Sequence, residues 1–205
     1  VAIPREKVVS YQEIFKQAGL TLRFFEVESL SLVRALAFGQ AGPALLLDIG
    51  SRSTNIVIAD RGFVRRSAQT DFAGASLTQA IGNGLGLNVQ RAEELKKQRG
   101  LLVKTEEKEL STLMLPFLDA IIDEVERARL AFEKDQGLKV EQIILAGSGA
   151  KLLGIAGYIE ERVSLKTSVG NPFLRLNYPA PVEVILNDLG PILAVAIGLG
   201  IKEFV

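Results

Sequence analysis

The stretch LLLDIGSRSTN, residues 45–55, runs from an apolar segment directly into an aspartate and a glycine. Its three leucines predict a buried strand that ends at Asp48. Gly50 predicts a tight turn after that strand, because glycine tolerates backbone conformations that other residues avoid. Two interpretations are open at this point: an ordinary strand end, or half of a phosphate-binding site.

The second interpretation rests on the small residues in and around the turn. Gly50, Ser51, Ser53 and Thr54 offer backbone N–H groups and hydroxyls without a bulky side chain in the way, which suits an anion. Asp48 itself cannot attract phosphate. It would instead hold Mg²⁺ through water, or orient an attacking water.

A second glycine turn lies in ILAGSGAKLLG, residues 144–154. An apolar strand runs into Gly147, Ser148 and Gly149, and a helix is expected to follow, so backbone could again approach a ligand closely. The turn lacks the Gly-Lys-Ser/Thr ending of a P-loop and is not a dinucleotide fingerprint. Alone, it is equally compatible with a plain strand-to-helix turn.

Composition narrows the classes of function. The chain has 205 residues, 48% of them hydrophobic, which is enough for one large domain or two small ones. Its formal net charge is zero, so no basic nucleic-acid surface is expected. It has neither cysteine nor histidine, which excludes disulfides, thiolate metal sites and histidine catalysis. The most apolar segment, 190–201, is shorter than the roughly 20 residues of a membrane span and predicts a buried helix.

Hydrophobic spacing along the chain alternates between strand and helix periods, which predicts α/β layers. Residues 1–28 predict a strand, a helix over 5–18 and a second strand, and 29–38 predict a further helix. A final helix is predicted over 188–203, with Asp188 as its cap. The remaining predicted elements are strands over 44–48, 55–60, 62–70 and 140–147, helices from 74 onward, over 88–100, over 110–134 and after 149, and a short strand near 165–169.

The two turns in this order resemble the actin-like ATPase superfamily, which has a ribonuclease H-like α/β fold. The resemblance implies that LLLDIGSRSTN is the second phosphate hairpin and that Gly147–Ser148–Gly149 is the adenosine turn. It also implies that Gly74, in GASLT, opens a nucleotide-facing helix. In AEELK, it implies that Glu93 and Lys96 reach the ribose and adenine. Without the resemblance, those two residues indicate an ion-paired, solvated helix face.

Other stretches resemble the PilM family in particular: AIPRE at the start, ESLSLVRA, DFAGASLTQAI, AEELKKQRG, VGNPF and the closing GPILAVAIGLGIKEF. This resemblance implies that 1–40 is part of a 1C subdomain with a connecting helix. It implies that 41–205 is mainly domain II, with an inserted subdomain at about 72–108 and the C-terminal helix 188–203. Arg52 and Asn55 depart from the FtsA-like pattern, which leaves efficient hydrolysis open.

The resemblance implies a cytoplasmic scaffold of the type IV pilus machine, peripheral to the inner membrane. It would bind ATP with Mg²⁺. Its partners would be a PilN-like tail of an inner-membrane protein and other platform proteins. Whether it also associates with itself is left open. Two alternatives remain: a degenerate actin-like interaction domain without nucleotide, and a sugar-kinase-like phosphotransferase. The chain begins at Val1 and shows no first phosphate hairpin, so we expect a fragment with an incomplete site.

Overall fold

The computed structural model describes residues 3–102 and 108–204, which build a five-stranded sheet in the order β3-β2-β1-β4-β5. β1 pairs antiparallel with β2 and parallel with β4, so the two strands that precede the glycine turns lie side by side. The strands are β1 Ala44–Ile49, β2 Thr54–Asp60, β3 Phe63–Thr70, β4 Gln142–Ala146 and β5 Lys166–Val169.

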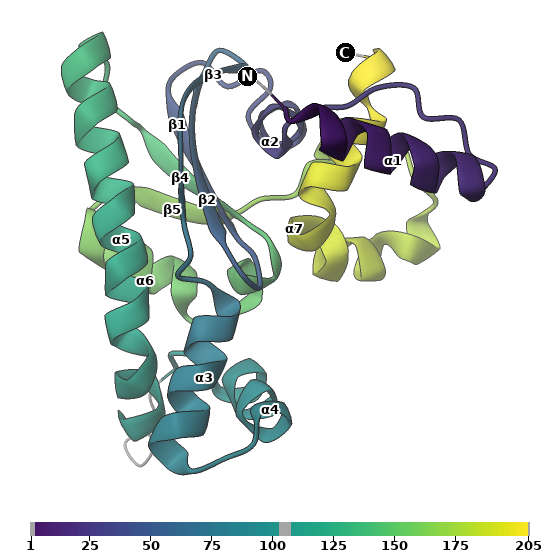
Figure 1. Cartoon of the computed structure of the whole chain (residues 1–205). Coiled ribbons are helices and arrows are strands. Elements are labelled where there is room, and N and C mark those ends of the chain that lie inside the picture. The colour runs from purple at the N-terminus through teal and green to yellow at the C-terminus, as the bar shows by residue number, and fades with distance from the viewer. Residues whose placement is uncertain (1–2, 103–107, 205) are drawn as a thin grey trace.

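Helices cover both faces of this sheet (Figure 1). α5 and α6 lie on one face and α2 and α7 on the other, while α3 and α4 lie beyond the end of the sheet. The helices are α1 Arg5–Gln17, α2 Glu28–Leu36, α3 Gly74–Leu85, α4 Val89–Arg99, α5 Lys108–Gln136, α6 Ile155–Val163 and α7 Glu183–Gly200. Short 3₁₀ turns are η1 Ser148–Lys151, η2 Pro172–Arg175, η3 Ala180–Val182 and η4 Lys202–Phe204. The predicted α/β architecture is confirmed.

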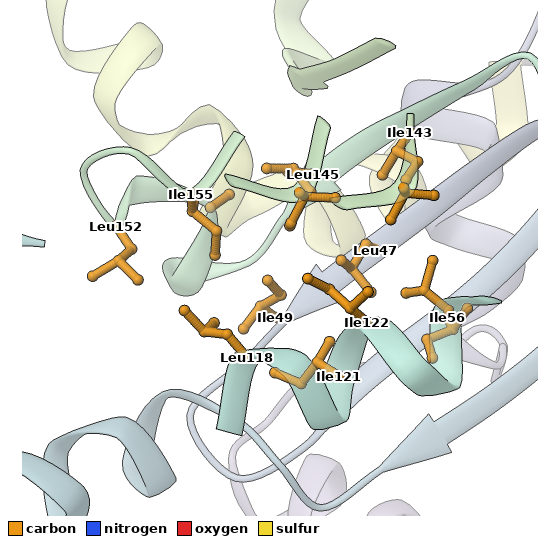
Figure 2. Close-up of a cluster of buried hydrophobic side chains, with 14 of the residues drawn as sticks. Leu47, Ile49, Ile56, Leu118, Ile121, Ile122, Ile143, Leu145, Leu152 and Ile155 are labelled. Carbon is orange, nitrogen blue, oxygen red and sulfur yellow. The ribbon is translucent and has the colours of Figure 1, made fainter. Parts of the chain in front are cut away.

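The side chains of β1 alternate between two apolar clusters, one on each face of the sheet. Leu47 and Ile49 belong to the larger cluster, where they pack with Leu118 of α5 (Figure 2). Leu46 points the other way and packs in the smaller cluster with Leu32 of α2. Burial on both faces explains why the sequence of β1 is a continuous apolar run rather than an alternating one.

The strand predicted at the end of residues 1–28 is wrong. Residues 20–27 have no regular secondary structure and pair with no strand in the described part of the chain. The alternation behind the prediction is present, since Leu22 and Phe24 are half-buried and Arg23 is exposed. Alternation fixes which side of a segment is covered, but a strand also needs a neighbouring ladder. Of the strand predicted at 1–3, residues 1 and 2 lie outside the described residues, and Ile3 is not in a strand.

The final helix begins earlier than predicted. α7 begins at Glu183, so Asp188 lies inside the helix and does not cap it. An aspartate cap with a proline three residues later is compatible with the first turn of a helix, but here Pro191 is accommodated within the helix. Asp188 instead forms an ion pair with Lys151 of η1, which ties α7 to the turn after β4. No helix in residues 3–102 and 108–204, α7 included, has the length and hydropathy needed to cross a bilayer.

Candidate functional site

The turn between β1 and β2 is bound to the start of α3. The Gly50 N–H donates to the Ser53 carbonyl at 3.0 Å, which closes the turn. The carbonyls of Gly50 and Ser51 then accept the N–H groups of Gly74 and Ala75 at 3.0 and 2.8 Å. The first amides of α3, which are usually left without a partner in a helix, therefore hold the turn in place.

The absence of a side chain at Gly74 favours this close docking. A Cβ atom there would lie 3.1 Å from the Gly50 carbonyl oxygen and 3.6 Å from Lys96 Nζ. The first distance is tighter than most Cβ contacts and the second is an ordinary van der Waals contact, so a side chain would require a small shift where the helix and the turn meet. Gly74, which the resemblance assigned to the start of a nucleotide-facing helix, is thus also favoured by the packing of that helix against the turn.

The structure places the predicted site residue Thr54 in the interior, and it does not line either cavity described below. Its side chain is fully buried, and its hydroxyl donates to the Phe72 carbonyl at 2.7 Å. The hydroxyl therefore connects the start of β2 to the segment before α3. Residue type alone suggested a phosphate ligand, but the first position of an inner strand faces the interior here.

The second glycine turn packs against the end of β1. Gly147 has a φ of 78°, and a Cβ atom there would lie 2.5 Å from Asp48 Oδ1. A Cβ atom on Gly149 would lie 2.6 Å from Ile49 Cβ. The Gly147 N–H donates to the Pro191 carbonyl at 2.8 Å. Both glycines are therefore required by the contact between the two turns, whatever binds nearby.

The helix expected directly after this turn begins later. Residues Ser148–Lys151 form the 3₁₀ turn η1, and α6 begins at Ile155 after Gly154, whose φ is 84°. The positive φ at Gly154 breaks the chain direction between η1 and α6. The sequence had suggested that the amides at the N-terminus of α6 would lie at Gly147–Gly149. In the structure they do not.

Two adjoining cavities lie between α3, α4 and η1. The first has a volume of about 570 Å³ and the second about 480 Å³. They share a rim built from four residues of three separate elements: Gly74 of α3, Glu93 and Lys96 of α4, and Ser148 of η1. The predicted residue Ser51 lines the first cavity, and Gly149 lines the second.

A hydrogen-bonded cluster occupies the shared rim. The Lys96 ammonium pairs with Glu93 Oε2 at 2.7 Å and donates to the Thr78 hydroxyl at 2.8 Å and the Gly74 carbonyl at 2.9 Å. The Thr78 hydroxyl lies 2.5 Å from Glu93 Oε2. Burial opposes ionisation of Glu93, but the hydrogen bonds from Lys96 and Thr78 outweigh it and hold its pKa below the ordinary value.

Asp48 lies outside these cavities, at the end of β1. Along β1 it follows Leu46 on the α2 side of the sheet, and it is opposite Asn55 in the β1–β2 ladder. Burial raises the pKa of the Asp48 carboxyl, the charge of Glu28 raises it further, and a hydrogen bond from Asn55 offsets part of the shift. Asn55 Nδ2 also donates to Glu28 Oε2 at 3.2 Å, so one amide lies between two carboxylates.

The two carboxylates form the acidic part of the site. Within the part of the chain that the structure describes, neither Asp48 nor Glu28 forms an ion pair, and no group of three or more metal-ligating side chains exists. Two carboxylates without a cationic partner suit a divalent cation that keeps most of its water, as Mg²⁺ does. Glu28 was not predicted, although its position at the first residue of α2 placed it near the strand ends.

The predicted site residues thus fall into three sets. Ser51, Gly74, Glu93, Lys96, Ser148 and Gly149 line the cavities, and Asp48 belongs to the acidic part. Gly50, Ser53, Thr54 and Gly147 shape the turns and are not among the lining residues. Sequence reasoning missed Thr78, Gln79 and Asn83 on α3. The signal was present, because Gly74, Thr78 and Gly82 are spaced four residues apart and so share one helix face.

Comparison with known proteins identifies the family to which the chain belongs. The family described as type IV pilus assembly protein PilM matches residues 1–204. Among solved structures, the PilM-PilN type IV pilus biogenesis complex has a TM-score of 0.82 and 25% sequence identity, with 97% of this chain and 58% of that chain covered. The match over nearly the whole chain confirms the resemblance drawn from the motifs.

More distant structures share the fold. MreB 5 of Spiroplasma citri bound to AMPPNP has a TM-score of 0.74 at 17% identity, covering 99% of this chain and 66% of that one. EutJ from Carboxydothermus hydrogenoformans has a TM-score of 0.65 at 18% identity, with 91% of this chain and 58% of that chain covered. This chain therefore spans less than two thirds of each of these proteins. The sheet order, the paired turns and these matches together establish that the chain has the actin-like fold and belongs to the PilM family of type IV pilus assembly proteins.

Proposed function

We propose that this chain supplies part of an ATP site at the shared rim of the two cavities and that the bound nucleotide regulates attachment of a PilN-like tail during type IV pilus assembly. The observation that carries the proposal is the convergence of Ser51, Gly74, Glu93 and Ser148, from four separate segments, on one cavity. Family membership supports the pilus context, the PilM-PilN complex supports the partner, and MreB 5 with AMPPNP supports the nucleotide.

Each part of the site suits a different part of the nucleotide. The backbone of the β1–β2 turn at Ser51 suits the phosphates, since its carbonyls are already engaged by α3 and its small residues leave room. Glu93 and Ser148 suit polar groups of the nucleoside. Asp48, with Glu28 nearby, suits Mg²⁺ held through water. The metal would supply charge neutralisation for the phosphates, and Asp48 would orient its water.

The proposal extends to organisation and location. Residues 1–40 would belong to a 1C subdomain and 41–205 mainly to domain II, with the insertion at about 72–108, of which residues 103–107 lie outside the described residues. The protein would act on the cytoplasmic side of the inner membrane, held there by the PilN-like tail and other platform proteins. Closure of the domains around ATP would change the affinity for that tail. Self-association belongs to the same proposal.

One alternative has an observation in its favour. Gly74, Gly147 and Gly149 all have packing reasons to be glycine, so an interaction domain that has lost nucleotide binding would retain them too. A phosphotransferase is less well supported. Glu93 is the one acidic side chain among the described residues that line the two cavities, and it is already engaged by Lys96.

Calorimetry with Mg·ATP on the full-length protein tests the proposal. Ser148 is exposed and lines both cavities, so Ser148→Tyr should fill the rim and lower affinity at least tenfold without disturbing the fold. Ser168→Tyr, on exposed β5 away from the rim, is the matched control and should bind as the unmodified protein does. Absence of ATP binding by the unmodified protein would favour the interaction domain.

Regulation needs a second measurement. The affinity of a synthetic PilN-like tail peptide should differ at least fivefold between the nucleotide-free and the ATP-bound protein, since a ligand shifts an equilibrium only through differential affinity. Ser148→Tyr should make the peptide affinity insensitive to ATP. Equal peptide affinity with and without bound ATP would reject regulation and leave nucleotide binding standing.

A further inference from the structure

The first half of α7 is joined to the wall of the second cavity. Ile192 lines that cavity together with residues of α4 and η1. The Pro191 carbonyl accepts the Gly147 N–H at 2.8 Å, and Asp188 forms an ion pair with Lys151 of η1. A ligand that fills this cavity would therefore contact both α4 and α7.

The second half of α7 crosses α2 at a contact between backbones. A Cβ atom on Gly198 would collide with the Ser31 carbonyl oxygen, so the two helices meet here without a side chain between them. Arg34 of α2 donates to the Gly198 carbonyl at 2.8 Å, which fixes the point of contact. With no side-chain ridge at this point, the angle between the two helices can change by a small amount. The Gly198–Ser31 contact is therefore suited to be a pivot for α7.

Residues 3–27 form an arm that includes α1 and lies outside the helical layers of the sheet (Figure 1). α1 has no buried residue and makes no extensive contact with any other helix or strand that the structure describes. Its Tyr11 packs edge-to-face on Phe25, with the ring centroids 5.9 Å apart. The direction of α1 therefore depends on how the end of the arm, residues 20–27, is held.

Lys202 of η4, which directly follows α7, holds the end of the arm. Its Nζ lies 3.3 Å from Glu26 Oε1 and 4.4 Å from the centroid of the Phe24 ring. The Lys202 side chain is 33% exposed and that of Glu26 only 4%, so both contacts are partly shielded from water. A second contact between the arm and η4, from Arg23 to Glu203, is 71% and 51% exposed and contributes little.

We propose that α7 is a lever between the cavities and the arm, and that Lys202 is the positioning residue that makes the arm follow α7. A ligand in the second cavity displaces α7 at Ile192, α7 turns about its contact with Ser31, and Lys202 passes the displacement to the arm. The inference rests on the proposed function, because ATP is the ligand that would displace α7. It goes further by naming the helix and the side chain that carry the movement.

The dimensions of the helices set the size of the movement. Between Ile192 and Gly200, α7 spans about 12 Å of helix, which is rigid enough to turn as one body. α1 has 13 residues and is therefore about 20 Å long. A rotation of roughly 10° at the pivot would move the far end of α1 by about 3 Å, which is within the range of known shifts between packed helices.

Pulsed EPR on the full-length protein tests the inference, in a background without other cysteines. Spin labels are placed by Lys7→Cys on α1 and Ser168→Cys on β5, which are both exposed positions. Mg·ATP should shift the mean distance between the labels by about 3 Å. Lys202→Met keeps a side chain of similar length without the ammonium. It should reduce the shift to below about 1 Å and broaden the distance distribution before nucleotide is added. Lys202→Arg keeps the cation and should keep the shift.

The matched control is Glu203→Gln, which removes only the exposed pair with Arg23 from the same turn and should leave the shift unchanged. Calorimetry should give Lys202→Met the ATP affinity of the unmodified protein, since Lys202 lines neither cavity. A loss of ATP affinity would mean that Lys202 supports the fold as a whole, and would overturn the inference.

The remaining outcomes separate the inference from the proposed function. An undiminished shift in Lys202→Met overturns the lever and leaves the proposed function intact. The absence of a shift in an otherwise unmodified protein that binds ATP also overturns the lever and leaves ATP binding intact. If the unmodified protein binds no ATP, the proposed function and the inference are both overturned.

Discussion

Gly147 lies so close to Asp48 that a Cβ atom at position 147 would stand 2.5 Å from Asp48 Oδ1. The residue also has a φ of 78°, which side chains rarely adopt. The two turns to which the sequence assigned ligand-binding residues therefore meet each other at the ends of β1 and β4.

This contact predicts that Gly147→Ala destabilises the protein without any ligand present. The expected loss is about 3 kcal/mol or more of unfolding free energy, from the positive φ and the collision with the end of β1. Gly137→Ala is the matched control. Its φ is also positive, at 67°, but nothing lies within 4 Å of its Cβ position, so a loss of about 1 kcal/mol is expected. Urea unfolding measures both, and equal losses would contradict the packing role.

The sequence predicted the strands around the turns because burial on both sheet faces leaves a strong signal. β1 is a run of apolar residues bounded by a glycine turn, and β2 and β3 follow at hairpin spacing. It also predicted the meeting of the two turns in one site, but only through the family resemblance. The pairing of β1 with β4 joins residues about a hundred positions apart, and no local pattern encodes that contact.

Residue type could not tell a glycine needed for a ligand from a glycine needed for packing. Gly147 and Gly149 fit both explanations in the sequence, and the structure supplies the packing one. Thr54 shows a related ambiguity, since a hydroxyl at a strand start can face either solvent or the interior, and here it faces the interior. Thr78 was missed although its spacing from Gly74 was visible, because a threonine inside a helix carries no distinctive signal without its partner on α4.

Thr54→Val should lower the unfolding free energy by about 1–2 kcal/mol and leave ATP affinity unchanged. The substitution removes a buried hydroxyl and leaves the Phe72 carbonyl without its 2.7 Å donor. Urea unfolding measures the first effect and calorimetry of the full-length protein the second. A tenfold fall in ATP affinity with unchanged stability would restore Thr54 to the binding surface.

Asp48→Asn should lower ATP turnover far more than ATP affinity. The amide keeps the shape of the side chain but cannot orient a water as a base or hold a cation by charge. We expect phosphate release in a single turnover to fall by at least a factor of ten, while the dissociation constant for ATP changes less than threefold. Turnover equal to that of the unmodified protein would remove Asp48 from the catalytic role.

The same substitution makes a separate prediction about stability. Burial and the charge of Glu28 raise the pKa of Asp48 above its unfolded value of 3.8, so the folded state holds the proton more tightly. The ionised side chain is then unfavourable at neutral pH. Asp48→Asn should raise the unfolding free energy at pH 7, and the gain should vanish as the pH falls below 3.8. A gain that persists at pH 3 would point to a cause other than charge.

Glu26→Gln should be strongly destabilising at neutral pH, by about 2–3 kcal/mol. The Glu26 side chain is only 4% exposed and accepts two 2.7 Å hydrogen bonds from Arg34, while Lys202 Nζ lies 3.3 Å from its Oε1. Hydrogen bonding from Arg34, against the opposing effect of burial, lowers the pKa of Glu26 from 4.5 to about 2. The stability that this carboxylate contributes is therefore complete above pH 4.5 and is lost as the pH falls toward 2.

Urea unfolding of the Glu26→Gln variant between pH 2 and pH 7 checks this window. The penalty should be largest at pH 7 and should shrink steadily below pH 4.5. Glu203→Gln is the matched control: Glu203 pairs with Arg23, but both side chains are more than half exposed, so the loss should stay below about 0.5 kcal/mol at every pH. A Glu26→Gln penalty that is the same at pH 2.5 and pH 7 would show that packing, and not the charge joining the 20–27 segment to α2 and η4, is what this residue contributes.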